Sequence, residues 1–325
     1  MAEQVNRREF LQGSMAVAAG AAMGIGSVQS SGAAEQPGRG RTDAGVGAKG
    51  MPMGQIKNLK VSRLISGGNL ISGWSHARDL AYVHHLMANY NTPEKVLETL
   101  ALLEENGVNT IIADPRKKPM DIFKKHWSLG GKIQWIAEGH PTPEDLHTNI
   151  KASIDWGASA VYLQGVIGDR WLKAGHVDQL GECVEFIKAQ GVPGGLGAHM
   201  IDVIVNSEAR GFDPDFYVKT LHHTNYWSTR RPDQNADVVD NNTDNYWDKN
   251  PEKTIEVMKA VKKPWIAFKV LAAGAIHPSS GFKYAFEGGA DFVCVGMFDF
   301  QVAEDAIIAK KTLDELKTRG RTWCV

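Results

Sequence analysis

Cysteine is scarce in this chain, with three residues among 325. Cys183 and Cys294 stand in apolar stretches, Cys324 stands at the C-terminal tail, and no two cysteines have the CxxC spacing. This argues against a disulfide framework and against a zinc site built from cysteine pairs. We expect two buried thiols that pack as small hydrophobic groups and one exposed thiol.

An excess of charge of either sign is also missing, since 36 lysines and arginines stand against 37 aspartates and glutamates, for a formal net charge of -1. A protein that binds nucleic acid needs a basic excess or a basic stripe to neutralise phosphates, and neither is evident. The composition therefore predicts no nucleic-acid partner.

The apolar stretch near the N-terminus is too short to cross a membrane, because residues 15–28 make 14 residues and a span needs about 20. It follows the sequence NRREFL (6–11) and precedes the small residues SGAA (31–34). These features resemble a twin-arginine export signal. The resemblance implies a signal peptide over residues 1–34, a mature protein without a transmembrane span, and a location in the periplasm or elsewhere outside the cytoplasm.

The rest of the chain divides into a leader and one regular domain. Residues 35–56 are rich in Gly, Arg and Ala without apolar periodicity, so we expect a flexible leader. Over 57–325, eight short apolar runs alternate with amphipathic stretches. The runs are residues 61–68, 109–113, 132–138, 159–164, 192–199, 215–221, 264–271 and 291–297. This number, order and spacing predict a single α/β domain, a (β/α)8 TIM barrel.

The helices between the runs have end signals. Thr92, Thr142 and Asn250 each precede a Pro-Glu pair, which is typical of an N-cap followed by proline at the first helical position. Gly107, Gly157 and Gly191 follow apolar-periodic segments and are expected to end helices.

Polar residues follow most of the apolar runs, and in a TIM barrel these C-terminal strand ends carry the active site. We therefore expect functional side chains at these positions. The candidates are Asn69, Asp114, Glu138, His140, Gln164, His199, Lys219, His222, His223, Lys269 and Asp299.

Two lysines lie inside adjacent apolar runs, Lys219 in 215–221 and Lys269 in 264–271. Burial and like charge would both lower a lysine pKa, as a Schiff-base amine requires at neutral pH. The alternative is that each lysine pairs with a carboxylate and is structural.

The segments DFYVKT (215–220) and FKVLAAGAIHP (268–278) resemble the two lysine-bearing segments of deoxyribose-phosphate aldolases and other Schiff-base aldolase barrels. The resemblance implies that Lys219 forms the Schiff base and that Lys269 lowers its pKa. The segments 273–278 and 289–297 are also similar to the phosphate sites of aldolase-type barrels, which implies substrate binding at Gly274.

A second resemblance lies nearer the N-terminus. The sequences 60–69 and 105–111 look like the opening strand and first helix-to-strand turn of aldo-keto reductases, and Asp114 stands where that family has its catalytic aspartate. No tyrosine follows Asp114 in the family's position, the third run has no interior lysine, and the fourth run ends in Gln164 rather than histidine. The resemblance implies an NAD(P)-linked oxidoreductase as an alternative.

Histidines and a carboxylate at several strand ends also suit a divalent metal that polarises a sugar carbonyl or hydroxyl. We take His140, His199 and His222 as the candidate ligands and Glu138 as a candidate general base. The alternative for each histidine is a hydrogen-bonded structural role.

Two long segments follow strand ends, 70–91 with Trp74 and 224–250 with Trp227 and Arg230. Aromatic rings mixed with polar groups are typical of carbohydrate sites, but also of interfaces between copies of a chain. We keep both interpretations, a substrate-binding surface and a homo-oligomer interface.

These observations predict an exported enzyme that acts on a sugar-like or hydroxy-carbonyl small molecule by proton transfer or by C–C or C–O lysis, as a lyase, aldolase or isomerase. Asp114, Glu138, Lys219 and Lys269 are the catalytic candidates; Asn69, Trp74, Gln164, Trp227, Arg230, Gly274 and Asp299 are the substrate-binding candidates. The alternatives are an aldo-keto-reductase-like oxidoreductase and a non-catalytic sugar-binding or assembly barrel.

Overall fold

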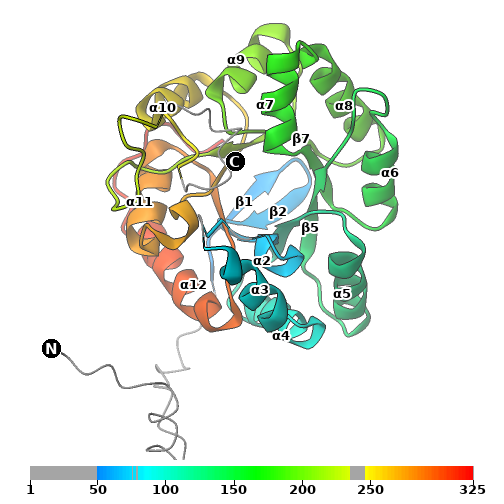
Figure 1. Cartoon of the computed structure of the whole chain (residues 1–325), viewed down its shortest axis with the longest axis vertical. Helices are drawn as coiled ribbons and strands as arrows, with labels where there is room; N and C mark the ends of the chain where they lie inside the picture. The colour runs from blue at the N-terminus through cyan, green and yellow to red at the C-terminus, as the bar shows by residue number, and fades with distance from the viewer. Residues whose placement is uncertain (1–49, 75, 78–79, 235–245, 325) are drawn as a thin grey trace, which may run out of the picture. The chain divides into compact units, whose positions relative to one another are not determined.

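A computed structural model describes residues 50–74, 76–77, 80–234 and 246–324. Eight parallel strands close into a barrel in the order β10-β3-β4-β5-β6-β7-β8-β9, which confirms the predicted (β/α)8 fold (Figure 1). The strands are β3 (Leu64–Gly67), β4 (Thr110–Ala113), β5 (Gln134–Gly139), β6 (Ala160–Leu163), β7 (Gly194–Ala198), β8 (Phe216–Thr220), β9 (Trp265–Phe268) and β10 (Phe292–Val295).

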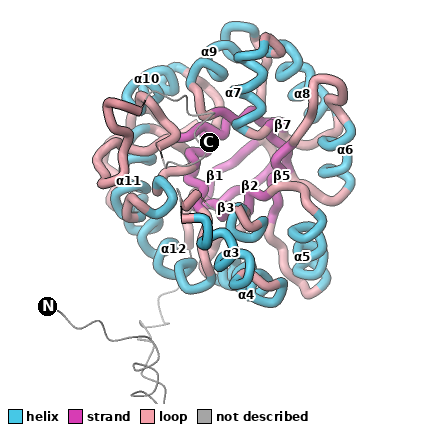
Figure 2. The backbone as a smooth tube through the Cα atoms, in the orientation of Figure 1, coloured by secondary structure: helices cyan, strands magenta, loops and turns pink. Residues whose placement is uncertain are grey.

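Helices surround the strands as an outer ring (Figure 2). They are α2 (Asn69–Ser72), α3 (Ala81–Tyr90), α4 (Pro93–Glu105), α5 (Lys117–Ser128), α6 (Thr148–Asp155), α7 (Gly165–Ala174), α8 (Val177–Ala189), α9 (Ile201–Arg210), α10 (Pro251–Ala260), α11 (Pro278–Gly288) and α12 (Asp299–Asp314), with a short 3-10 helix η2 (Ala272–Gly274). None of the helices in these described stretches is long and apolar enough to cross a membrane.

The end signals in the sequence are confirmed in part. The Thr92 and Asn250 side chains accept hydrogen bonds from the backbone N–H groups of Lys95 and Lys253 and so cap α4 and α10. The cap predicted at Thr142 is wrong, because Thr142 and Asp145 exchange backbone hydrogen bonds in a tight turn and α6 begins only at Thr148. A threonine–proline pair suits a turn as well as a helix start.

The three glycines expected to end helices all have positive φ, at 79° for Gly107, 108° for Gly157 and 84° for Gly191. This left-handed conformation is the one that glycine adopts easily after a helix. The long segment 70–91 holds most of α2 and all of α3. Residues 235–245 of the second long segment lie outside the described part of the chain.

The strands are buried on both sides, which divides the core into two layers. Ile65, Ile112, Ile136, Val218 and Ile266 belong to the cluster inside the barrel, and the residues next to them pack outward against the helices.

Glycines in β7 make room inside the barrel. A Cβ atom on Gly195 would lie 2.5 Å from the Phe216 ring, and one on Gly197 would lie 2.9 Å from the Tyr162 ring. These aromatic side chains therefore fill space that side chains of β7 would otherwise occupy.

A short antiparallel hairpin, β1 (Met53–Ile56) and β2 (Leu59–Ser62), precedes the barrel. Its Ile56 and Val61 join the interior cluster, and the Lys60 carbonyl accepts hydrogen bonds from Asn109 and Gln134 at the starts of β4 and β5. The hairpin therefore closes the amino-terminal end of the barrel. The predicted leader, 35–56, overlaps this hairpin at its last residues, and its residues 35–49 lie outside the described chain.

The three thiols are free; Cys183 and Cys294 are buried and Cys324 is partly exposed. Burial raises the pKa of the Cys183 thiol to about 12, so this group stays protonated at neutral pH. The environment fits the packing role expected for a cysteine in an apolar stretch.

We predict that Ile56→Ala destabilises the barrel by about 2–5 kcal/mol, because the change leaves a cavity at its closed end. Urea denaturation followed by circular dichroism measures the effect. Lys60→Ala in the same hairpin is the control, since this side chain is exposed. Equal stability of the two variants would show that the hairpin does not contribute to the core.

Candidate active site

Four polar side chains are directed to the centre of the barrel by strand alternation. Each stands two residues after an interior residue of its strand: Asp114 after Ile112, Glu138 after Ile136, Gln164 after Tyr162 and His199 after Gly197. They come from the ends of the consecutive strands β4, β5, β6 and β7. The structure thus brings these four predicted residues together at the C-terminal face.

Glu138 is buried and has few hydrogen-bond donors. Gln164 Nε2 donates to Glu138 Oε2 at 3.2 Å, and the Tyr162 hydroxyl is a second partner. Burial raises the pKa of Glu138 to about 7, and the nearby Asp114 carboxylate adds to the rise. At neutral pH this carboxyl group can therefore take up or release a proton.

Asp114 is more fully engaged. Its carboxylate accepts hydrogen bonds from the Ser72 hydroxyl and from Trp74 Nε1, at 3.2 Å for the indole, and pairs with Arg116 Nε at 2.9 Å. Asp114 therefore anchors Trp74 and Arg116, and its charge acts on the neighbouring Glu138. A catalytic role for Asp114 stays a prediction.

His199 has a fixed orientation. Its Nδ1 lies 2.8 Å from Oδ2 of Asp169, a fully buried residue of α7 that also accepts the backbone N–H groups of His199 and Met200. An ionised Asp169 requires the proton on Nδ1, which leaves Nε2 as a base. Burial lowers the pKa of His199 despite the carboxylate, so the ring is neutral at pH 7.

Lys269 joins the same group of side chains, but through a left-handed backbone conformation and not through strand alternation. It follows the last residue of β9 with φ 57°, a left-handed conformation that is costly for a lysine. Its Nζ lies 2.9 Å from Nε2 of His76 and 4.1 Å from the centre of the Trp247 ring. Burial lowers the pKa of Lys269 to about 7, although the carboxylates of Glu138 and Asp169 oppose the change.

His76 is the hydrogen-bond acceptor for Lys269. Burial and the neighbouring lysine charge lower its pKa to about 3, so the imidazole is neutral. Its ring meets Trp247 edge-on with 4.9 Å between centroids. His76 and Trp247 come from the two long segments, so Lys269 lies where both segments meet the strand ends.

Lys219 does not belong to this group, which corrects the expectation from the aldolase resemblance. It alternates with Phe216 and Val218 of the interior and so points outward, like Tyr217. The side chain is fully buried and its Nζ pairs with Asp248 Oδ2 at 3.1 Å. Lys219 therefore has the alternative role, that of a structural lysine paired with a carboxylate.

His222 is also structural. Its Nδ1 lies 3.0 Å from the His223 carbonyl, and its Nε2 accepts the backbone N–H groups of Trp247 and Asp248 at 2.9 and 3.1 Å. Both ring nitrogens are occupied, so neither can bind a metal. His222 instead holds the segment that carries Trp247.

The predicted metal ligands do not fit a metal centre. His199 could offer only Nε2, because its Nδ1 contacts Asp169, and His140 Nε2 lies 3.9 Å from Glu138 Oε2. Among the residues described, no group of three His, Cys, Asp or Glu side chains could hold a metal ion. We therefore derive no step through a metal.

Three further substrate-binding candidates, Asn69, Gly274 and Asp299, make no side-chain hydrogen bond or ion pair to this group within the described chain. Asn69 begins α2 directly after β3, and Gly274 lies in η2 with φ 88°. Asp299 accepts hydrogen bonds from Tyr90 and Lys95 and thereby joins α12 to α3 and α4, so it has a structural partner set that the sequence did not reveal.

Trp227 is 77% exposed, and Arg230 Nε donates to the Gln234 carbonyl at 2.6 Å. Both residues precede the stretch 235–245, which the structure leaves undescribed. Their role in substrate binding stays a prediction.

Four residues of the group were not among the candidates: His76, Tyr162, Asp169 and Trp247. Tyr162 could have been found from alternation, because it stands two residues before Gln164. His76 and Trp247 stand in the long segments that were expected to cover this face, but nothing in the sequence pairs either with Lys269. Asp169 lies inside α7, and a carboxylate within a helix is normally expected on the protein surface, so the sequence offered no reason to place it at the site.

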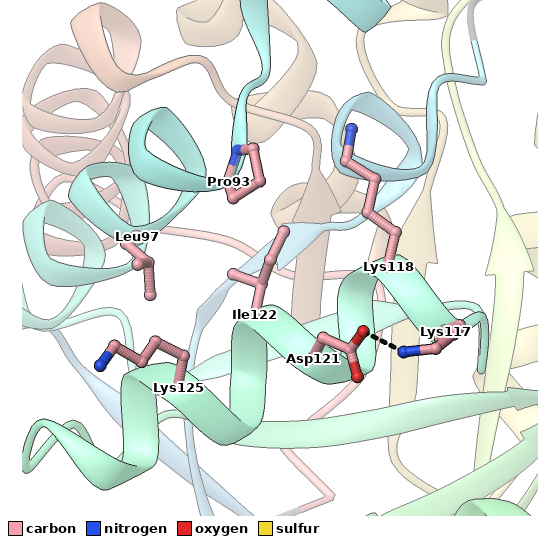
Figure 3. Close-up of a pocket in the computed structure, with 7 residues that line it drawn as sticks. All are labelled: Pro93, Leu97, Lys117, Lys118, Asp121, Ile122 and Lys125. Carbon is pink, nitrogen blue, oxygen red and sulfur yellow. Dashed lines mark hydrogen bonds and ion pairs between the residues drawn. The ribbon is translucent and has the colours of Figure 1, made fainter.

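A surface hollow of about 430 Å³ lies elsewhere, between α4 and α5 (Figure 3). Pro93 and Leu97 line it from α4, and Lys117, Lys118, Asp121, Ile122 and Lys125 line it from α5. Its one carboxylate, Asp121, pairs with Lys117 at 2.6 Å. None of the residues at the strand ends lines this hollow.

Comparison with known proteins supports export and the fold. The family model for the twin-arginine translocation pathway signal sequence matches residues 4–24, so the chain carries this signal and is exported to the periplasm or another space outside the cytoplasm. Curated protein sequences give no match.

Two solved structures are similar in backbone. PA4992 from Pseudomonas aeruginosa, described as a candidate aldo-keto reductase, has a TM-score of 0.53 at 14% identity, over 81% of this chain and 95% of that protein. Gox0644 in its apo form has a TM-score of 0.49 at 8% identity, over 84% and 98%. The likeness to PA4992 shows the barrel fold alone.

The two lysines should respond in opposite ways to replacement by methionine. Lys219→Met leaves Asp248 as a buried charge without its partner, so we expect a loss of about 3–5 kcal/mol in unfolding free energy. Lys269→Met removes a cation that burial disfavours, so we expect unchanged or higher stability. Urea denaturation measures both, and Lys219→Met with Asp248→Asn should recover part of the loss. Unchanged stability in Lys219→Met would contradict the structural role.

Proposed function

We propose that the chain is an exported enzyme that moves a proton next to the carbonyl group of a small polyhydroxylated molecule, as an isomerase or a lyase. One observation carries the proposal: Glu138 and Lys269, an acid and a base with pKa values both shifted to about 7, interact within one group of side chains at the C-terminal face. Opposite shifts of neighbouring titratable groups are typical of acid–base sites.

In the first step, the ionised Glu138 carboxylate takes the proton from the carbon beside the carbonyl. The electron pair of the broken C–H bond forms a C=C bond, and the carbonyl electrons move onto oxygen to give an enolate. The Lys269 ammonium supplies the positive charge that stabilises this oxygen. Its position against the Trp247 ring keeps the ammonium at the face of the barrel.

In the second step, the proton returns. Delivery by Glu138 to the neighbouring carbon gives an isomer, with His199 Nε2 moving the hydroxyl proton between the two oxygens. In a lyase, the enolate instead re-forms its carbonyl, a C=C bond forms to the next carbon, and the hydroxyl on that carbon takes the proton from Glu138 and leaves as water. Asp169 keeps the proton on His199 Nδ1, so Nε2 can accept and return a proton without a change of tautomer.

The aromatic side chains favour a carbohydrate-like substrate. Trp74 and Trp247 both contact the polar group, Trp74 through a hydrogen bond to Asp114 and Trp247 through its ring against Lys269. An indole face packs against the C–H groups of a sugar, while the polar side chains take its hydroxyl groups.

An aldo-keto-reductase-like oxidoreductase is the second candidate, supported by the fold likeness to PA4992. It requires a general acid beside the carbonyl and a nicotinamide cofactor. Quenching of tryptophan fluorescence by NADH or NADPH would favour this candidate.

Deuterium exchange tests the proton transfer without knowledge of the natural substrate. We expect the protein in D2O to introduce deuterium beside the carbonyl of one or more members of a panel of aldoses, ketoses and sugar acids, as read by proton NMR. Glu138→Gln keeps the size of the side chain but removes the base, so exchange should fall by about 10²–10⁴-fold. Glu105→Gln, an exposed glutamate, is the control.

Two results would count against this mechanism. Exchange that is equal in Glu138→Gln and in the wild type would exclude Glu138 as the base. A covalent substrate adduct that borohydride traps on Lys269 would show that this lysine forms a Schiff base, and not that its ammonium stabilises the enolate oxygen.

The pH dependence of exchange should be bell-shaped with its maximum near pH 7. Activity needs Glu138 ionised, which holds above its pKa of about 7, and Lys269 protonated, which holds below its pKa of about 7. In Lys269→Arg the guanidinium stays charged, so the loss of activity at high pH should disappear while the loss at low pH remains. Rates measured from pH 5 to 9 check this; a flat wild-type profile would be inconsistent with both assignments.

A further inference from the structure

Arg116 lies at the edge of the site, and its guanidinium pairs with a carboxylate through Nε alone. Arg116 is the residue before α5, and its Nε lies 2.9 Å from Asp114 Oδ2. The guanidinium also stacks over the Trp74 ring at 4.4 Å, and Trp74 Nε1 donates to the same Asp114 carboxylate. The ion pair and the ring contact hold the guanidinium beside Asp114 and Trp74.

The terminal nitrogens of Arg116 are not used in the ion pair with Asp114, which Nε makes. Within the described ranges, they have no hydrogen bond or ion pair to another side chain or to the backbone, and the side chain is 55% exposed. A guanidinium whose Nε side is fixed and whose Nη groups are free presents two parallel N–H donors, the geometry that pairs with a carboxylate.

His140 connects Arg116 to the proposed base. Its Nε2 atom is buried, has no hydrogen-bond partner within the described chain, and lies 3.9 Å from Glu138 Oε2. The charges of Asp114 and Arg116 both act on this imidazole. A buried nitrogen without a partner is costly unless a ligand group satisfies it, and a hydroxyl can donate to it or accept from it.

We propose that Arg116 binds a carboxylate of the substrate and that the substrate of this site is a polyhydroxylated acid rather than a neutral sugar. The inference rests on the proposed function, because it places the acid end at Arg116, a hydroxyl at His140 and the reacting carbon near Glu138. Arg116, His140 and Glu138 then bind successive parts of one chain of carbon atoms.

The surrounding charges agree with an anionic ligand. The Asp114 carboxylate offsets part of the Arg116 charge on its Nε side. The Nη donors of the guanidinium and the Lys269 ammonium are the groups that attract a substrate carboxylate. The first turn of α5 carries no acidic residue, so no carboxylate there opposes an anion beside Arg116. Lys117 and Lys118 lie next to Arg116 in sequence, but they are engaged by Asp121 and by the Asn91 carbonyl.

Calorimetric titration of the full chain with D-gluconate and with D-glucitol, its uncharged analogue, tests the inference. We expect D-gluconate to bind at least ten-fold more tightly and its affinity to fall with added salt. Arg116→Gln should lose about ten- to hundred-fold in gluconate affinity and leave glucitol unaffected, whereas Arg116→Lys should keep part of the preference. Lys117→Gln, a neighbouring surface cation outside the site, is the matched control.

The outcomes separate this inference from the proposed function. Equal affinity for the two ligands, or gluconate binding that is the same in Arg116→Gln and Lys117→Gln, would overturn the carboxylate site. Glu138→Gln should keep the preference for gluconate while it loses deuterium exchange. A wild-type protein that binds gluconate through Arg116 but exchanges no deuterium into any member of the panel of aldoses, ketoses and sugar acids would retain the carboxylate site and reject the proton-transfer mechanism.

Discussion

Strand alternation is the constraint on which the rest of this structure depends. In a closed barrel, every second side chain of a strand points inward, so the inward position at the end of each strand is fixed by the interior residues before it. Ile112 and Ile136 thereby direct Asp114 and Glu138 to the centre. The same rule directs Lys219 outward, since it follows Val218 by one residue.

Two kinds of buried charge result from this geometry. The Lys219 side chain points out of the barrel interior and pairs with Asp248, which suits a permanent ion pair. Glu138 and Lys269 lie at the centre, where burial shifts the pKa of each toward 7. A group held near its pKa costs stability but can exchange protons, so the second pair marks the part of the barrel where chemistry is expected.

The sequence predicted much of this. Each of the eight apolar runs contains one barrel strand, and Asp114, Glu138, Gln164 and His199 lie together as their positions at strand ends implied. The sequence could not show which of Lys219 and Lys269 lies at the centre of the barrel. Apolar residues occur on both faces of the strand in 215–221, so the pattern does not show which face points inward. His222 was misleading for a related reason: its partners are backbone N–H groups of residues 247 and 248, which no side-chain pattern reports.

The sequence by itself therefore determined the export signal, the number and order of the strands, and the strand ends at which polar side chains gather, because each depends on local composition and periodicity. Only the tertiary structure decided which side chains reach the centre and with what charge. Lys269 turns inward through a left-handed backbone conformation, and His76 meets it across 193 residues of chain. Such contacts join segments that are distant in sequence, and the pKa of each group follows from the burial that those contacts create.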